Sequence, residues 1–224
     1  MQRQKRYKIA AAILVFLLFV AMVVFRIGHH SGNRSEDNKI TDVIVKVSTE
    51  HTYGSGVIWR FDEEQVIILT AAHVVAGADG DDGSGVTITF HDTGTAMAQK
   101  VEYAPGTDLV FVTIPIGNLK AWTQRSLRAV TQDKAAFDAL SQEAPVLLAG
   151  DGKVLTGTVE ETWIYVTDFS QHMLLVDGEI QPGMSGGGLF DEQENFLGIL
   201  LGCSSDGETA VLPLSVILAA WEAR

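Results

Sequence analysis

One stretch of this sequence carries a serine in a setting suited to nucleophilic chemistry. Residues 181–189 read Gln-Pro-Gly-Met-Ser-Gly-Gly-Gly-Leu, so that Ser185 stands among glycines. A serine that attacks a carbonyl carbon needs a tight turn beneath it and backbone N–H groups directed at the oxygen that becomes negative. Glycine permits positive φ in such a turn and leaves room for the substrate carbonyl. Gly/Ser-rich turns are also ordinary loops, so this stretch alone does not separate an acyl-transfer site from a connection.

A base and a carboxylate that could serve this serine stand earlier in the chain. His73 ends a Thr-Ala-Ala-His sequence after an apolar run, and Asp108 precedes another apolar run. Histidine titrates near neutral pH and can take the proton of a serine hydroxyl. A carboxylate fixes the histidine tautomer and stabilises the imidazolium that forms. The three residue types occur in the order His, Asp, Ser, and each is predicted to lie at a strand end or a turn.

Three short motifs together resemble those of trypsin/chymotrypsin-fold serine proteases, and they are most similar to the HtrA-type (DegP-like) bacterial branch. Residues 70–73 match the histidine motif of this family, residues 108–110 its aspartate motif and residues 183–187 its serine motif. The resemblance implies an endopeptidase that cleaves peptide bonds through an acyl-enzyme intermediate. It implies a protein or peptide substrate and no cofactor or metal.

The family pattern also assigns roles to individual residues. Ser185 is the expected nucleophile, His73 the general base and then acid, and Asp108 the residue that orients His73. The backbone N–H groups of Gly183 and Ser185 are expected to form the oxyanion hole. The expected substrate pocket comprises six residues, which are Glu179, Ile180, Gln181, Leu201, Gly202 and Cys203. Glu179 favours a basic P1 residue, whereas the HtrA-type pattern favours a small or medium apolar one, so the P1 preference stays open.

The sequence departs from the family at three points. Met184 stands where many animal members have an aspartate that pairs with a new N-terminus after zymogen cleavage, so activation by that route is not expected. Cys203 is the only cysteine, which excludes an internal disulfide, and we interpret it as a small apolar residue. The sequence after the predicted C-terminal helix leaves no room for a PDZ domain, so we expect a member without one.

The pattern of short apolar runs and turns predicts an all-β fold. Twenty-two glycines and alternating or continuous apolar runs of five to eight residues indicate many strands joined by tight turns. We expect two antiparallel six-stranded β-barrels of the trypsin/chymotrypsin type, followed by a C-terminal helix. The expected protease domain spans residues 41–224, with barrel one at about 41–114, a linker at 115–128, barrel two at about 129–212 and the helix at 213–223. The glycines around Ser55 suit a bulge or a close backbone approach.

The N-terminal segment is predicted to be a membrane anchor. Residues 1–8 form a basic tail, and residues 9–27 are apolar up to Arg26, which is near the short limit for a membrane-spanning helix. A cleaved signal peptide is the rival interpretation, but bulky residues follow the apolar run where small ones would be needed. Residues 28–40 are predicted to be a flexible tether. The basic tail places the N-terminus in the cytoplasm, and the protease domain would then be periplasmic or extracellular.

The charge of the remaining chain limits its partners. Residues 1–26 hold five of the 16 basic residues and none of the 28 acidic ones, which leaves the rest with a net charge of −17. Bulk electrostatics therefore exclude nucleic acid as a partner, while the oligomeric state stays open. A non-catalytic or latent trypsin-fold module, acting as an envelope sensor or scaffold, is the alternative to an active enzyme.

Overall fold

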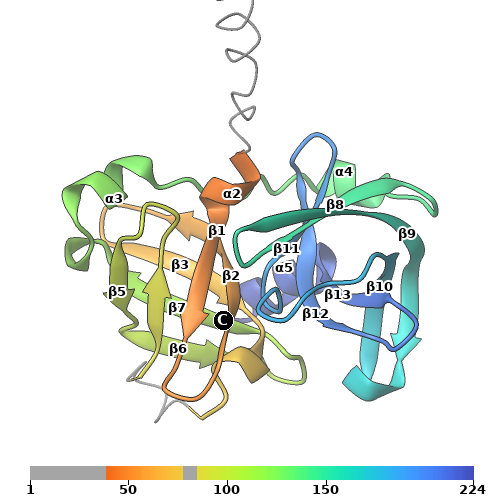
Figure 1. Ribbon diagram of the computed structural model, residues 1–224, viewed down its shortest axis with the longest axis horizontal. Coiled ribbons are helices and arrows are strands. Elements are labelled where there is room, and N and C mark those ends of the chain that lie inside the picture. Colours follow the sequence, from red (N-terminus) through yellow and green to blue (C-terminus); the bar gives the residue numbers. More distant parts are fainter. Residues whose placement is uncertain (1–38, 78–84) are drawn as a thin grey trace, which may run out of the picture. The chain divides into compact units, whose positions relative to one another are not determined.

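The computed structural model of the protein describes residues 39–77 and 85–224. In these residues the chain forms two β-structures, one from each half of the sequence, with few and short helices between them (Figure 1). No helix in the described ranges is long and apolar enough to cross a membrane. The predicted anchor at residues 9–27 lies outside the described residues.

The first half forms a seven-stranded antiparallel sheet in the order β5-β4-β1-β2-β3-β7-β6. Its strands are β1 (Ile44–Ser48), β2 (Tyr53–Phe61), β3 (Gln65–Thr70), β4 (Thr87–Thr89), β5 (Thr95–Met97), β6 (Lys100–Tyr103) and β7 (Val110–Pro115). β3 is buried along almost its whole length because the side chains on both of its faces belong to the core, which explains its continuous apolar sequence.

The first half was predicted to be a closed six-stranded barrel, and this prediction was wrong because the strands form a seven-stranded sheet. The chain does not run as one strand from β5 to β6, because β5 pairs with β4 and β6 pairs with β7. The chain changes partner at its bend, where Ala98 donates to Val86 and Gln99 donates to Thr113. A run of apolar and polar residues gives the length of an extended segment but not the point at which it changes partner.

The second half forms the closed six-stranded barrel that was expected. Its strands are β8 (Pro145–Gly150), β9 (Lys153–Val166), β10 (Gln171–Asp177), β11 (Gly188–Asp191), β12 (Phe196–Cys203) and β13 (Glu208–Pro213). They are ordered β10-β13-β12-β11-β8-β9, and β9 pairs with β10 to close the ring. Asp151 and Gly152 both have positive φ (49° and 70°), as a two-residue type I′ turn between β8 and β9 requires.

Short helices connect and flank these strands. They are α2 (Lys39–Val43), η1 (Ala72–Val74), η2 (Ile116–Asn118), α3 (Ala121–Ser126), α4 (Lys134–Asp138), η3 (Thr167–Phe169) and α5 (Leu214–Glu222). α2 packs into the core, since Ile40 is 2% exposed. The Asp133 side chain caps α4 by accepting the N–H groups of Ala135 and Ala136.

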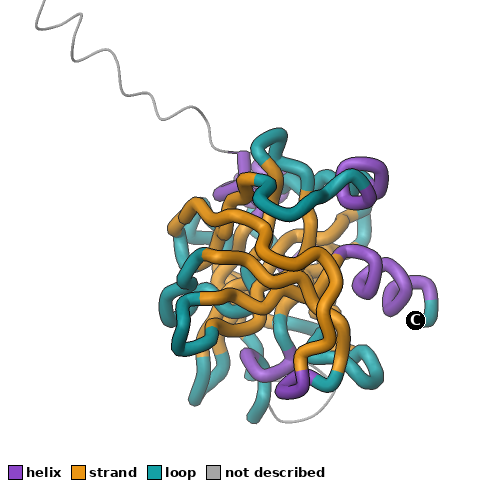
Figure 2. Tube along the Cα trace, turned by 90° about the vertical axis from the view of Figure 1, so that its right-hand side faces the viewer, coloured by secondary structure: helices purple, strands orange, loops and turns teal. Residues whose placement is uncertain are grey.

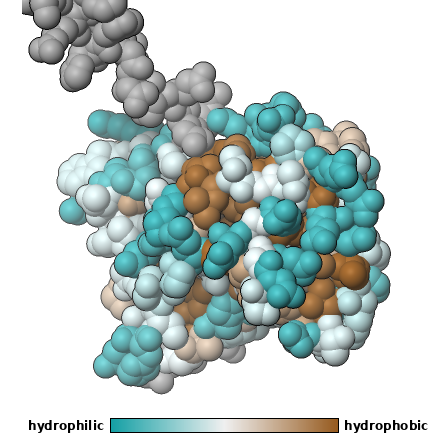
Figure 3. Space-filling view, turned by 45° about the vertical axis from the view of Figure 1, so that its right-hand side comes forward, coloured by the Kyte–Doolittle hydropathy of each residue, from teal (hydrophilic) through white to brown (hydrophobic). Residues whose placement is uncertain are grey.

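An aromatic cluster joins the C-terminal helix to the first sheet. Trp221 of α5 packs with ring centroids 5.4 Å from Phe111 of β7 and 6.5 Å from Trp59 of β2. Trp59 also packs edge-on against Phe196 of β12. Figure 2 shows α5 beside the strands at the end of the chain. Figure 3 shows one face, on which hydrophobic patches lie among hydrophilic residues. The buried apolar side chains form two clusters.

Candidate active site

The pairing of β3 with β7 brings a histidine and an aspartate together. Thr70 at the end of β3 pairs with Val110 at the start of β7. His73 follows Thr70 in η1, and Asp108 precedes Val110, so both residues leave the sheet at the same edge. The backbone N–H of Ala72 donates to the Asp108 carbonyl oxygen at 3.4 Å and so joins the two segments beyond the strand ends.

Asp108 holds His73 through both carboxylate oxygens. Oδ2 lies 2.6 Å from His73 Nδ1, and Oδ1 accepts the His73 backbone N–H at 3.0 Å. Burial acts to raise the pKa of Asp108, but the hydrogen bonds and charge of His73 outweigh it, and the net pKa lies below the ordinary aspartate value. The carboxylate is therefore ionised at neutral pH and can only accept. Nδ1 must carry the proton, which leaves the Nε2 lone pair of His73 as a base.

The serine segment consists of two successive tight turns. In the first, Met184 N donates to Gln181 O at 3.0 Å, and Gly183 has φ +91°, as the third position of a type II turn requires. In the second, Gly187 N donates to Met184 O at 2.9 Å, and Gly186 has φ +83°. The prediction that glycines supply positive φ around this serine is confirmed at both positions.

These turns leave two backbone N–H groups without a partner. Within the described residues, neither Gly183 N nor Ser185 N donates a hydrogen bond, although both residues are partly buried. Nearly all buried N–H groups in proteins are paired, so two unpaired donors two residues apart mark a site for an acceptor from outside the chain. A developing oxyanion is an acceptor of this kind.

The Ser185 hydroxyl is bonded to backbone. Ser185 Oγ donates to the carbonyl oxygen of Leu201 in β12 at 3.1 Å. No hydrogen bond joins Ser185 to His73 in the described part of the chain. Attack on a substrate therefore requires the hydroxyl to rotate from Leu201 toward His73.

The serine turns lie directly against β2 of the first sheet. Ser55 N donates to Ser185 O at 2.8 Å. A Cβ placed on Gly54 would lie 2.7 Å from the Val74 side chain and 2.8 Å from Ser185 O. Val74 follows His73, so the histidine and the serine segments meet at Gly54. The expectation of a close backbone approach at these glycines is confirmed.

Met184 explains how the serine segment is held without an aspartate at this position. Its side chain is fully buried in the core of the second barrel, in the same cluster as Ile180 and Leu189. Its sulfur accepts the Gln181 N–H at 3.4 Å. Apolar packing therefore anchors the segment beside the nucleophile.

The residues predicted for the substrate pocket lie in different environments. The Ile180 and Leu201 side chains are 9% and 2% exposed and belong to the two cores, so Leu201 meets the site only through its carbonyl. The others are exposed or partly buried, namely Glu179, Gln181, Gly202 and Cys203. Phe169 of η3 lies 3.7 Å from where a Gly202 Cβ would be. The P1 preference stays open, and the pocket assignment stays a prediction.

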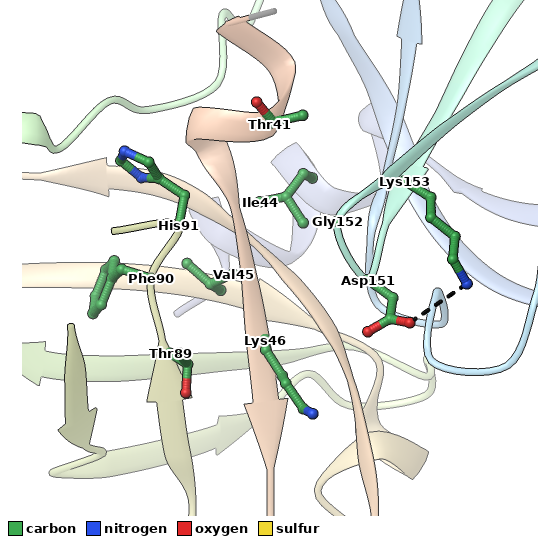
Figure 4. A pocket seen from close by; sticks show the side chains of 10 residues that line it. All are labelled: Thr41, Ile44, Val45, Lys46, Thr89, Phe90, His91, Asp151, Gly152 and Lys153. Carbon is green, nitrogen blue, oxygen red and sulfur yellow. Dashed lines mark ion pairs between the residues drawn. The ribbon is translucent and has the colours of Figure 1, made fainter. Parts of the chain in front are cut away.

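A cavity lies between β1 and the β8–β9 turn. It has a volume of about 450 Å³, and Figure 4 shows the Asp151 side chain directed toward β1, with Lys153 paired to it. Lys153 Nζ lies 3.7 Å from Asp151 Oδ2 and donates to Gln181 Oε1 at 2.8 Å, so the cavity wall is tied to the first serine turn.

Sequence reasoning missed two contributors to this site. One is the Leu201 carbonyl, for which a sequence carries no signal because any residue could supply it. The other is Ser55, whose side chain contacts Gly183 from a position 128 residues earlier. Its glycine neighbours signalled the close approach, but nothing distinguished its hydroxyl from that of a surface serine.

Comparison with known sequences identifies one family. The family described as "Trypsin-like peptidase domain" matches residues 54–199, which include His73, Asp108 and Ser185. No curated protein sequence matches the chain significantly.

Solved structures of proteases share the fold. The Rv3671c protease of M. tuberculosis in its active form has a TM-score of 0.65 at 19% identity, covering 85% of this chain and 84% of that one. Its inactive form has a TM-score of 0.64 at 19% identity, covering 83% and 90%. The HtrA-type protease AlgW with a tripeptide has a TM-score of 0.65 at 23% identity, covering 82% of this chain and 60% of AlgW.

Proposed function

The chain belongs to the trypsin-like peptidase family, a family of serine proteases, and we propose that it is a membrane-anchored endopeptidase that acts outside the cytoplasm. The observation that carries the proposed chemistry is the His73–Asp108 pair, at 2.6 Å, next to a serine whose turns leave two N–H groups without a partner among the residues that the structure describes. A base, a nucleophile and an oxyanion site in one place are the components of acyl transfer.

In the acylation step, Ser185 Oγ attacks the carbonyl carbon of the peptide bond while His73 Nε2 takes the hydroxyl proton. The carbonyl oxygen becomes negative and accepts hydrogen bonds from Gly183 N and Ser185 N. Each such donor contributes about 10²–10³ to the rate in well-studied cases. The C–N bond then breaks as His73 returns the proton to the leaving nitrogen, and an ester to Ser185 remains.

In the deacylation step, a water molecule gives a proton to His73 Nε2 and attacks the ester carbonyl. The same two N–H groups stabilise the second tetrahedral intermediate. The C–Oγ bond breaks, His73 returns the proton to Ser185, and the carboxylic acid product leaves. Asp108 stays ionised throughout and keeps the imidazole ring in its tautomer and orientation.

The proposed location follows from the N-terminal sequence. Four of the first eight residues are basic, and no charged residue occurs from Ile9 to Phe25. Such a segment is typical of an uncleaved helix with its N-terminus in the cytoplasm. Fractionation of cells that express the full chain tests this. We expect the chain to stay in the membrane fraction after alkaline extraction. We also expect protease added outside the cytoplasmic membrane to digest the domain.

One observation is also consistent with a latent resting form of the same enzyme. The Ser185 hydroxyl donates to Leu201 O at 3.1 Å rather than to His73. A substrate carbonyl that occupies the oxyanion site would bring the hydroxyl toward His73. In this alternative, activity depends on a ligand that turns Ser185.

Intact mass spectrometry of the detergent-solubilised full chain after treatment with a fluorophosphonate tests the catalytic proposal. One adduct is expected on the wild type and none on Ser185→Ala. Ser126→Ala, which removes a hydroxyl bonded to Thr123 O in α3, is the matched control and should label like the wild type. Hydrolysis of a casein substrate should be lost in Ser185→Ala alone. Equal hydrolysis by wild type and Ser185→Ala would refute the mechanism, and labelling only with added peptide would establish the latent form.

A further inference from the structure

Both residues that offer an unpaired N–H have their carbonyl oxygens bonded to one buried serine. Ser55 Oγ donates to Gly183 O at 2.7 Å, and Ser55 N donates to Ser185 O at 2.8 Å. We propose that Ser55 is a positioning residue that sets the spacing of the two oxyanion donors. This inference rests on the function proposed above.

The Ser55 hydroxyl both donates and accepts a hydrogen bond in this arrangement. It donates to Gly183 O and accepts the backbone N–H of Asp151 at 2.8 Å. Ser55 is 0% exposed, so water does not compete for either bond. The hydroxyl therefore joins the first serine turn to the β8–β9 turn at a single point.

Ser55 itself is fixed to the first sheet. It pairs with Lys46 of β1, and its carbonyl oxygen accepts the hydroxyl of buried Thr70 at 2.6 Å. Thr70 is the last residue of β3, three residues before His73. The same strand ends that position the base therefore also position Ser55.

The Ser55 hydroxyl restrains a peptide group that has few other restraints. The peptide between Gly183 and Met184 is held at its oxygen by Ser55 and at its N–H by Gln181 O. Gly183 has no side chain and lies at φ +91°, so local sterics do not oppose its rotation. Removal of the hydroxyl frees the carbonyl of Gly183, so the whole residue can reorient and its N–H can move relative to Ser185 N.

This placement predicts an effect on the transition state rather than on substrate binding. The oxyanion forms only during reaction, so donors that drift apart lose contact with the tetrahedral intermediate. Ser55 does not touch the substrate in this scheme. A hydroxyl with a purely structural role would instead change stability and leave kcat unaltered.

The test compares Ser55→Ala with the wild type and with Ser126→Ala, which removes a comparable hydroxyl–carbonyl bond in α3. Full-chain protein is assayed with a peptide substrate and with a peptide aldehyde, which forms a tetrahedral adduct with the serine. We expect kcat of Ser55→Ala to fall about 10- to 100-fold, less than for loss of a donor. KM should change by less than about threefold, and Ki for the aldehyde should rise in parallel with the fall in kcat.

Each outcome bears on the inference. Folded Ser55→Ala with kcat within about twofold of the wild type, or with only KM raised, would overturn it. If Ser55→Ala does not fold, Ser55→Cys is measured instead, because its thiol keeps a weak donor of similar size. A kcat between those of the wild type and of Ser185→Ala supports the inference, and a wild-type kcat overturns it. Activity that survives in Ser185→Ala refutes the proposed function instead, so the two failures are distinguishable.

Discussion

The hydroxyl of Ser185 donates to the carbonyl oxygen of Leu201 in β12 at 3.1 Å. The proposed chemistry needs this hydroxyl to bond to His73 instead. A bond of this kind contributes about 0.5–1.5 kcal/mol. Its replacement by a bond to His73 therefore changes the rate by at most about tenfold. The resting contact is compatible with an active enzyme as well as with a latent one.

Asp108→Asn should lower kcat by about 10⁴. An amide at this position can donate to His73 Nδ1 and so favours the tautomer with its proton on Nε2, which removes the base. Steady-state kinetics with a peptide substrate measure the effect. Asp138→Asn, whose exposed carboxylate pairs only with Lys134 on α4, should retain wild-type kcat. A comparable loss in both variants would contradict the tautomer argument.

The stability difference between wild type and Asp108→Asn should depend on pH in the acid range. The Asp108 pKa is lower in the folded chain than the ordinary value of about 3.9, mainly because hydrogen bonds and charge from His73 outweigh burial. Ionised Asp108 therefore stabilises the fold above the unfolded pKa, and this contribution is lost as pH falls through the folded pKa. Urea unfolding at steps from about pH 5 to about pH 2.5 should show the difference shrinking. A constant difference over this range would show that the pKa is not lowered.

Gly150→Ala should impair catalysis from a position outside the triad. A Cβ at this residue would lie 2.8 Å from Met184 Cα and 2.9 Å from Met184 O. Backbone atoms cannot rotate away, so the serine segment must shift, and a displacement of 1 Å can lower the rate about 10²-fold. Gly117→Ala is the control because its Cβ would meet nothing within 4 Å. Kinetics and circular dichroism of both variants are the measurements, and unchanged kcat in folded Gly150→Ala would refute this account.

Phe196→Ala should destabilise the domain by about 3–5 kcal/mol. Phe196 is 0% exposed and packs against Trp59 and Phe190, with ring centroids at 6.1 and 5.7 Å. Trp122 is 57% exposed and contacts Lys120, so Trp122→Ala should cost less than about 1 kcal/mol. Urea denaturation monitored by far-UV circular dichroism compares the two. Similar losses would mean that Phe196 is not part of a close-packed core.

Much of the second barrel was predictable because its strands are bounded by turn residues. The C-terminal helix was expected at residues 213–223 and spans Leu214–Glu222. The His, Asp and Ser motifs could be recognised in the sequence because each lies within a few residues of a strand end, and their catalytic roles stay a prediction. The Ser55 contact could not be predicted, since it joins side chain to backbone across 128 residues. The chain changes its pairing partner from β4 at β5 to β7 at β6. This change depends on the tertiary arrangement of the strands, which the local sequence pattern does not contain.

The bond between Ser55 N and Ser185 O has a consequence for biosynthesis. His73 and Asp108 belong to the first half of the chain, whereas Ser185 and its turns belong to the second. A nascent chain that has folded only its first sheet has a base without a nucleophile. In the proposed mechanism, cleaving activity therefore arises only after β12 has been made and the serine segment has docked on Ser55. The order of synthesis alone therefore keeps an incomplete copy from digesting itself or its neighbours.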